Sequence, residues 1–376
     1  MPLRLLQQTD DVRGKVVLLR TSLNVPIVNG EVRDMFRLRQ ALPTIRFLQN
    51  AGAIIVLLGH IGRKPNETLR PVLRALQSLI EVEWIDSLDT PDLGTYLKAQ
   101  APGTIFLLEN LRQYAGETDN DAEFTAKLAA LGDIYVNDAF ANSHREHASM
   151  VGVPAYLPAY AGLQVATEVE ALEAARTPQA PGLFILGGAK FETKLGLVEQ
   201  YLKTYDHIFI GGALAHDVLL ARGYSVGKSL VSDVSLANAS FINSERLLLP
   251  VDVIVQTAGG EIKTVPIDSV SADDTIMDCG PATLTMLQPH IAAAKTILWN
   301  GPLGNYEAGF RSGTEGLAVL LADSQAATYV GGGDTVAAID SVGRNKDLTF
   351  ISTGGGAMLS YLEAGTLPAL KPLLLS

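Results

Sequence analysis

The sequence predicts a two-part α/β protein with parallel sheets covered by helices. Short runs of apolar and β-branched residues alternate with amphipathic stretches, a pattern typical of parallel strands joined by right-handed helical crossovers. A chain of 376 residues suits two domains better than one core. Its composition, 47% hydrophobic but only 6% aromatic and 18% charged, fits buried parallel sheet.

Ten segments carry the strand pattern and three stretches between them carry a clear helical one. The predicted strands are 16–20, 54–60, 105–109, 134–137, 183–186, 207–210, 251–255, 296–299, 327–330 and 349–352. The predicted helices are 121–131, 197–205 and 315–322.

The boundary between the two parts is expected near residue 180. A helical stretch over 166–176 is followed by Pro178, Pro181 and Gly182, which suit a connector better than an element interior. We expect a first lobe over 1–163, a connecting helix and linker over 164–180 and a second lobe over 181–356. The tail, 357–376, has two prolines and no new strand, so we expect it to pack back on the first lobe.

Composition excludes several classes of function. The net charge of −11 argues against nucleic acid as a partner, which needs a broad basic face. The longest apolar runs are far shorter than the ~20 residues of a membrane span, and the first residues lack a signal-peptide pattern, so we expect a cytoplasmic protein. The single cysteine, Cys279, excludes an internal disulfide and is expected to be a buried hydrophobe.

Basic residues collect in the first half, where 13 of the 17 arginines lie at or before Arg176. Ligands of open α/β sheets bind beyond the carboxyl ends of the strands. One such arginine alone is usually just surface, but basic groups after four predicted strands favour a shared anion site, since arginine's planar fork suits carboxylate and phosphate. The residues at these strand ends are 20–24, His60, Arg63, 109–110, Arg112, 137–138, His144, Arg145 and His147.

One arginine outside the strand ends is expected beside the same ligand. Arg37 closely follows the turn formed by residues 24–26. Its neighbour Arg39 would point to a different face of the helix, so we expect Arg39 at the surface.

Glycine collects in the second half, with 24 of 35 at or after Gly182. A single glycine pair often marks only a plain turn. Five glycine turns at predicted strand ends instead indicate a nucleotide-sized polyanion, because glycine lets the backbone approach a ligand and helix N-termini direct N–H groups at phosphates. These turns are 187–188, 211–212, 300–302, 331–335 and 352–356.

Charged side chains accompany the glycine turns. Lys190 and Lys194 are four residues apart, so they can share a helix face and either contact phosphates or form a solvated helix edge. Asp334 follows three glycines and is a candidate ligand of phosphate-bound Mg²⁺, which typically takes one or two protein carboxylates.

Three other motifs are discounted. Residues 227–229, Gly-Lys-Ser, lack the earlier glycine and the strand of a P-loop, and no G-x-G-x-x-G follows a strand. His144 and His147 enclose Arg145, a cation that would repel Zn²⁺, so hydrogen bonding to an anionic substrate is the better interpretation.

Taken together, these segments resemble the phosphoglycerate kinase family, in order and at the family's spacing, over essentially the whole chain. The matching segments, besides Arg37, are NVP (24–26), ALPTI (41–45), GHIGR (59–63), LENLR (108–112), VNDAF (136–140), HREH (144–147), GGAK (187–190), LPVDV (249–253), WNGP (299–302), GGGD (331–334) and STGGG (352–356).

The resemblance implies two Rossmann-like lobes joined by a hinge helix, with a cleft that closes to exclude water. It implies 3-phosphoglycerate on the first lobe, Mg²⁺ with ADP or ATP on the second, and a monomer. The expected acceptor-site residues are Ser22, Asn24, Arg37, His60, Arg63, Arg112 and Arg145. The expected nucleotide and metal residues are Lys194, Gly211, Gly212, Asn300, Glu307 on the ribose, Gly332, Gly333, Asp334 and Thr335. The residues expected around the transferred phosphoryl group are Arg37, Lys190, Lys194 and the helix start at 354–356, including Gly354 and Gly355.

The chain also departs from the family pattern, mostly in the acceptor lobe. Ser22 replaces an expected aspartate, Gly59 a usual serine and Gln113 a usual aromatic residue, while Ala-Asn-Ser at 141–143 replaces Gly-Thr-Ala and Ser360 an expected glutamate. Besides a working phosphoglycerate kinase, two hypotheses therefore stay open. One is a nucleotide-binding relative with little or no turnover, and the other is an acyl-phosphate kinase for another acid.

Overall fold

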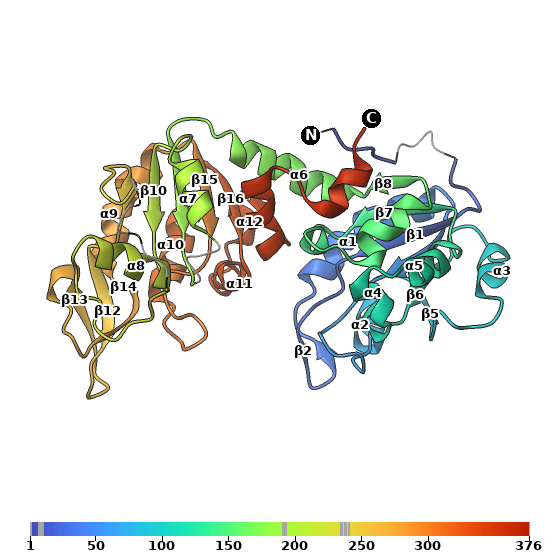
Figure 1. Cartoon of the computed structure of the whole chain (residues 1–376), viewed down its shortest axis with the longest axis horizontal. Helices are drawn as coiled ribbons and strands as arrows, with labels where there is room; N and C mark the ends of the chain where they lie inside the picture. Colours follow the sequence, from blue (N-terminus) through green and yellow to red (C-terminus); the bar gives the residue numbers. More distant parts are fainter. Residues whose placement is uncertain are drawn as a thin grey trace. The chain divides into compact units, whose positions relative to one another are not determined.

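The computed structural model describes residues 2–6, 11–189, 194–233, 236, 239 and 241–375. Contacts divide the chain into two compact units, one of Met1–Glu170 with Ala364–Ser376 and one of Ala171–Glu363. Each unit is built on its own six-stranded sheet with helices on both faces (Figure 1). No helix in the described part of the chain is long and apolar enough to cross a membrane.

The sheet of the first unit is parallel throughout. Its strands, in spatial order, are β5 (Glu83–Ile85), β6 (Ile105–Leu108), β4 (Ile54–Leu58), β1 (Val16–Thr21), β7 (Ile134–Asp138) and β8 (Ala159–Ala161). The helices are α1 (Phe36–Asn50), α2 (Arg70–Gln77), α3 (Leu93–Lys98), α4 (Ala115–Asp119), α5 (Ala122–Ala129) and α6 (Leu163–Arg176), which ends in the second unit.

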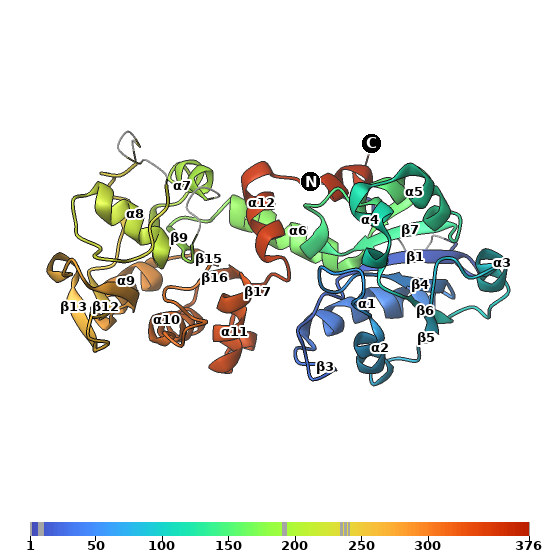
Figure 2. The same ribbon diagram turned by 60° about the horizontal axis from the view of Figure 1, so that its bottom comes forward.

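Side chains that point to alternate faces along each strand explain how helices cover both faces of this sheet. Val17 and Leu19 of β1 pack in one core with Leu38 of α1 and Leu76 of α2, since alternate residues of a strand face opposite sides. Figure 2 shows α1 and α2 on one side of the sheet and α4 and α5 on the other. Because these strands are parallel, the carboxyl ends of β1, β4, β6 and β7 meet at one edge of the sheet.

The main sheet of the second unit is also parallel throughout. In spatial order it contains β11 (Leu247–Leu248), β10 (His207–Ile210), β9 (Gly182–Leu186), β15 (Thr296–Asn300), β16 (Ala327–Gly331) and β17 (Phe350–Ile351). Its helices are α7 (Leu195–Tyr201), α8 (Ala213–Ala221), α9 (Pro281–Ala293), α10 (Ser312–Ala322), α11 (Gly333–Ser341) and α12 (Gly355–Ala364). Figure 2 shows α7 and α8 on one side and α9, α10 and α11 on the other. The predicted parallel sheets covered by helices are confirmed.

One predicted strand belongs to a different kind of sheet. The strand expected at 251–255 is β12 (Asp252–Gln256), which pairs antiparallel with β13 (Ile262–Pro266) and β14 (Thr275–Cys279). The expectation of parallel pairing is wrong here because only residues 257–261 connect β12 to β13. So short a connection can reverse the chain but cannot hold a crossover helix.

The last residues of the chain lie against the first unit. Ala369 N donates to Ser143 O at 3.1 Å, and Asn137 Nδ2 donates to Ala369 O at 3.3 Å. Leu375 N donates to Pro2 O at 3.1 Å. These bonds explain why residues 364–376 belong to the unit of the N-terminal residues.

Candidate active site

Five glycine-rich turns of the second unit form one continuous edge. They follow β10, β9, β15, β16 and β17, five strands that are neighbours in the sheet. A Cβ added at Gly212 would lie 2.7 Å from Gly188 N, and one at Gly187 would lie 2.3 Å from Pro302 O. Only glycine permits backbones to approach this closely.

Helix N-termini open onto the same edge. Helices α8, α11 and α12 begin at Ala213, Gly333 and Gly355, directly after three of the turns. Their first N–H groups have no partner within the helix and carry partial positive charge. The edge therefore offers what a polyphosphate needs, which is close access to backbone donors.

Lys194 brings a cation to this edge. Its Nζ donates to Gly187 O at 2.8 Å, and the side chain is buried. Burial lowers the pKa of Lys194 to about 8. Lys194 immediately precedes α7, and Lys190 lies outside the described residues, so the expected sharing of a helix face stays a prediction.

Asp334, the metal ligand expected from the sequence, lies beside the glycine edge. Asp334 lies in the first turn of α11 and lines a pocket together with Gly188 and Gly212. Among the described residues, no three His, Cys, Asp or Glu side chains gather as a metal cluster. A single carboxylate beside a phosphate-binding edge suits Mg²⁺ that keeps phosphate and water ligands.

The pocket extends from the glycine edge over an apolar floor. Its lining includes the predicted residues Gly212, Glu307 and Asp334. Apolar side chains complete it: Leu219 from α8, Val253 and Met277 from the antiparallel sheet, and Leu230 and Leu303 from connecting segments.

Two residues predicted to contact the nucleotide lie beneath this surface. Thr335 is fully buried, and its Oγ1 accepts a hydrogen bond from Gly301 N at 3.0 Å. Asn300 is also buried, and its Nδ2 lies 3.7 Å from Met358 Sδ. Both side chains brace the glycine turns from within the unit.

In the first unit, three predicted residues meet at the ends of β1 and β4. Gly62 N donates to Asn24 Oδ1 at 3.0 Å, and Arg37 Nη1 donates to Asn24 O at 2.7 Å. The Arg112 guanidinium donates to Gly62 O. Asn24, Arg37 and Arg112, distant in sequence, are thus joined through two short backbone segments.

As expected, the neighbouring Arg39 is exposed at the surface.

Three arginines line an open pocket next to this cluster. Arg63, Arg112 and Arg145 come from three separate strand ends. Burial is the largest cause that lowers the pKa of Arg112, and the positive charge of Arg145 is the second largest. Three like charges this close favour an anion between them.

His60 and Ser22 present buried polar atoms at the same strand ends. Among the described residues, neither His60 Nε2 nor Ser22 Oγ has a hydrogen-bond partner. Burial, reinforced by Arg20 and Arg112, holds the pKa of His60 far below its usual value. His60 is therefore neutral at physiological pH.

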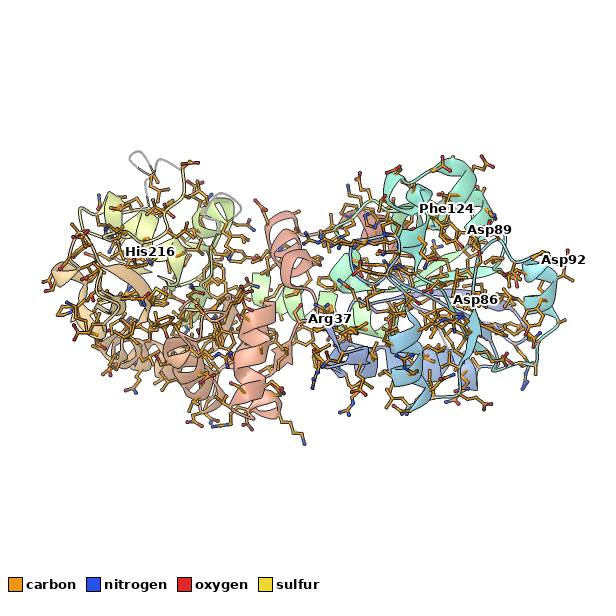
Figure 3. The ribbon with its side chains drawn as sticks, turned by 90° about the horizontal axis from the view of Figure 1, so that it is seen from below. Arg37, Asp86, Asp89, Asp92, Phe124 and His216 are labelled. Atoms are coloured by element: carbon orange, nitrogen blue, oxygen red, sulfur yellow. The ribbon has the colours of Figure 1, made fainter. Side chains whose placement is uncertain are left out.

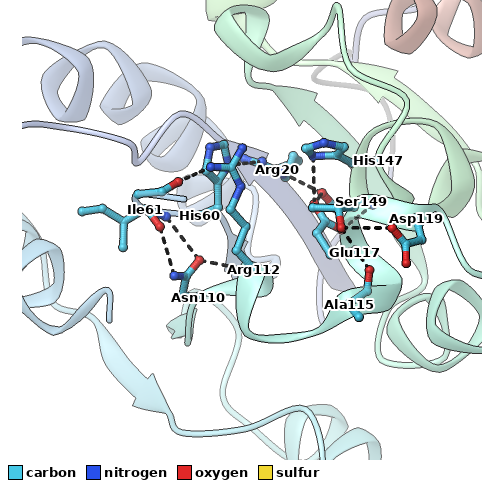
Figure 4. Close-up of polar contacts among 12 residues, drawn as sticks. Arg20, His60, Ile61, Asn110, Arg112, Ala115, Glu117, Asp119, His147 and Ser149 are labelled. Carbon is cyan, nitrogen blue, oxygen red and sulfur yellow. Dashed lines mark hydrogen bonds and ion pairs between the residues drawn. The ribbon is translucent and has the colours of Figure 1, made fainter. Parts of the chain in front are cut away.

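A buried network behind His60 was missed by the sequence analysis (Figure 4). Arg20 was expected to present its charge at the strand edge, but it is fully buried. Its Nη2 donates to His60 Nδ1 at 2.9 Å and its Nε to Ser149 Oγ at 2.9 Å. Ser149 Oγ in turn donates to Glu117 Oε1 at 2.6 Å. The buried carboxylate of Glu117 thus compensates the buried positive charge of Arg20.

His147 lies at the margin of this network. Its Nδ1 is 3.8 Å from Glu117 Oε1. Burial, followed by the charge of Arg145, lowers the pKa of His147 to about 4. The contact with Glu117 gives His147 a structural neighbour in addition to the substrate role expected from the sequence.

Comparisons with known proteins agree with this geometry. The family model described as phosphoglycerate kinase matches residues 6–365. A phosphoglycerate kinase of Rubrobacter xylanophilus is 44% identical over 96% of each chain, and one of Pelotomaculum thermopropionicum is 40% identical over 97% of each chain.

Solved structures agree as well. The structure of phosphoglycerate kinase from Coxiella burnetii matches with a TM-score of 0.84 and 38% identity, over 98% of each chain. That from Pyrococcus horikoshii matches with a TM-score of 0.85 and 32% identity, again over 98% of each chain. With a matching family model and several full-length relatives above 30% identity, this chain belongs to the phosphoglycerate kinase family.

Proposed function

We propose that this chain is a phosphoglycerate kinase, which transfers a phosphoryl group reversibly between 1,3-bisphosphoglycerate and ADP to give 3-phosphoglycerate and ATP. The observation that supports this most directly is the continuous glycine edge, with Lys194 and Asp334 beside the pocket that opens from it. A monomeric cytoplasmic enzyme of glycolysis is the expected form.

On the acceptor side, the arginines of the first unit hold 3-phosphoglycerate. Arg63, Arg112 and Arg145 line one pocket, and guanidinium groups bind phosphate oxygens bidentately. His60 Nε2 and Asn24 complete the site, with Arg37 anchored on the Asn24 carbonyl. Arg37 would neutralise charge on the phosphoryl group during transfer.

On the donor side, the glycine edge takes the polyphosphate and the adjoining pocket takes the nucleoside. Glu307 lies on the pocket wall as the candidate partner of the ribose hydroxyls. Asp334 would hold Mg²⁺ together with the phosphates, and the ion would supply further charge neutralisation there. Lys194 and the N–H groups at the starts of α11 and α12 would face the phosphoryl oxygens.

This chemistry needs no general base. The attacking carboxylate of 3-phosphoglycerate is already ionised at neutral pH. Catalysis then rests on in-line positioning and on stabilising charge at the equatorial phosphoryl oxygens. Arg37, Lys194 and backbone N–H groups are suited to that task, because they are fixed donors that need little rearrangement.

A coupled assay with 3-phosphoglycerate and Mg-ATP tests the proposal, with Arg37→Ala as the matched variant. We expect turnover by the natural chain, and for Arg37→Ala a loss of rate that far exceeds any change in nucleotide affinity. Nucleotide binding without turnover would instead support a non-catalytic relative. Turnover only with another carboxylic acid would support a different acyl-phosphate kinase.

A further inference from the structure

A buried histidine borders the apolar floor of the pocket of the second unit. His216 belongs to α8 (Figure 3) and lines the pocket next to Leu219 and Leu230. It is only 5% exposed. The chemistry proposed above assigns His216 no role, so its presence beside an apolar floor needs a separate explanation.

The hydrogen bond of His216 fixes which ring nitrogen carries the proton. His216 Nδ1 lies 2.7 Å from Leu230 O. A carbonyl oxygen can only accept, so Nδ1 must be the donor. Burial lowers the pKa of His216 below its usual value, which keeps the ring neutral. In this tautomer Nε2 bears a lone pair and can only accept a hydrogen bond.

The accepting nitrogen is not used within the described part of the protein. There, no group donates a hydrogen bond to His216 Nε2. The carboxylate of Asp278, which also lines the pocket, is already engaged, because it accepts from Gly313 N, Ser312 Oγ and Cys279 N. His216 therefore offers an acceptor to whatever occupies the pocket.

The position of His216 along α8 indicates which part of a nucleotide it meets. The helix starts at the glycine edge, and Gly212, Ala213, Ala215, His216 and Leu219 line the pocket in turn. With a rise of about 1.5 Å per residue, His216 and Leu219 lie roughly 6–10 Å beyond the phosphate-binding end. A ribose would span that interval, which would bring the base of a bound nucleotide against His216 and Leu219.

We propose that His216 Nε2 accepts a hydrogen bond from the amino group at position 6 of a purine, which makes this residue a determinant of preference for adenine nucleotides. The inference rests on the proposed function, since it places a nucleotide in the pocket. Hypoxanthine and guanine carry an oxygen at position 6. Either base would set an acceptor against the acceptor nitrogen of His216, an arrangement that costs affinity.

The segment that carries Leu230 is held by a second, independent contact. Asp217 Oδ1 accepts from Ser232 N at 2.9 Å and from Ser232 Oγ at 3.0 Å. Asp217→Asn weakens this anchor without changing His216 Nε2. It is therefore a matched control for any general loosening of the pocket wall that replacing His216 causes.

The test is to measure dissociation constants of ADP, IDP and GDP by calorimetry for the natural chain, His216→Phe and Asp217→Asn. We expect the natural chain to bind ADP about tenfold more tightly than IDP or GDP, as a well-placed hydrogen bond allows. His216→Phe should bind all three with similar affinity. Asp217→Asn should weaken all three alike and keep the tenfold ratio.

Each contrary outcome has a distinct meaning. Equal affinities for the three diphosphates in the natural chain, or an unchanged ratio in His216→Phe, would overturn the role of His216 alone. Tighter binding of GDP than of ADP would show that the amino group at position 2 is recognised instead, and would also overturn it. Failure to bind any diphosphate would overturn the proposed function and the inference with it.

Discussion

Arg20 Nη2 donates a hydrogen bond to His60 Nδ1 over 2.9 Å, so His60 carries its proton on Nε2. A guanidinium has only donors, which leaves Nδ1 as the acceptor and the imidazole neutral. The Nε2–H, which has no acceptor among the described residues, is then a donor that could serve the anion proposed for this site without adding a charge. Ser149 and Glu117 hold Arg20 in place behind it.

Arg20→Met should destabilise the fold and weaken the acceptor site. It leaves Glu117 buried without its cation, which typically costs about 3–5 kcal/mol, measurable by urea unfolding. The KM for 3-phosphoglycerate should rise while the KM for ATP stays unchanged. Arg20→Met with Glu117→Gln should recover part of the stability but not the KM. Full recovery of both would show that Arg20 has no part in positioning His60.

Ser22→Asp should tighten binding of 3-phosphoglycerate. Ser22 is buried at the end of β1, where the family pattern has an aspartate that suits the glycerate hydroxyl. We expect a KM for 3-phosphoglycerate about tenfold lower, the size of one charge-assisted hydrogen bond, and an unchanged KM for ATP. Weaker binding would mean that the loop of residues 21–24 has been rebuilt around the serine.

The sequence predicted the strand ends well because that information is local. Parallel strands bring their carboxyl ends to one edge, so residues such as Gly188 and Gly212 could be grouped without knowing the strand order. The role of Arg20 could not be predicted in this way. Its partner Ser149 is 129 residues away, and a run ending in Val-Val-Leu-Leu-Arg does not show whether the arginine turns inward.

The wall of the nucleotide pocket was missed for a related reason. The sequence predicted a strand at 251–255, but it predicted neither of the strands that pair with it, β13 and β14. Val253 and Met277 line the pocket, but the sequence analysis did not predict this role for them. His216 gave no signal either, because a lone histidine in a helix usually indicates nothing beyond its own packing.

Gly59→Ala should destabilise the first unit through a clash with Leu23. A Cβ at position 59 would lie 2.5 Å from Leu23 Cδ1 and 2.8 Å from Leu23 Cγ, and Leu23 is buried. Overpacking of this kind typically costs about 1–3 kcal/mol. In a double-mutant cycle measured by urea unfolding, Leu23→Ala should remove much of that cost. Strictly additive effects would show that the two positions do not constrain each other.

Asp138→Asn should change how stability depends on pH. Asp138 Oδ1 accepts from Gln164 N at 2.9 Å, at the start of α6. Burial raises the pKa of Asp138 to about 7. Hydrogen bonds from Thr44 and from the helix amides lower the pKa, but their effect is smaller than that of burial. A carboxyl whose pKa is raised by folding contributes stability below its unfolded pKa, and this stability is lost as pH rises through about 7.

Relative to Asp138→Asn, the natural chain should therefore lose stability between about pH 4 and pH 7. The loss should be on the order of 4 kcal/mol, since each pH unit between the two pKa values corresponds to about 1.4 kcal/mol. Urea unfolding of both proteins at several pH values measures this difference. A constant difference across the range would contradict a raised pKa for Asp138.

Lys194 should make nucleotide binding weaken above pH 8. Burial lowers its pKa to about 8, so the free protein loses this charge as pH rises, while bound phosphates favour the ammonium form. Each ADP that binds at higher pH must then be accompanied by one proton. We expect the dissociation constant of Mg-ADP to rise about tenfold per pH unit above 8. Calorimetry in two buffers of different ionisation enthalpy should detect proton uptake.

Lys194→Arg is the matched control, because a guanidinium keeps its charge throughout this range. Its affinity for Mg-ADP should hardly change between pH 8 and pH 9.5, and no proton should be taken up. The free phosphate groups of ADP are already ionised above pH 7, so they do not produce the same effect. If the natural chain and Lys194→Arg lose affinity in parallel, another group titrates and Lys194 does not contact the phosphates as a cation.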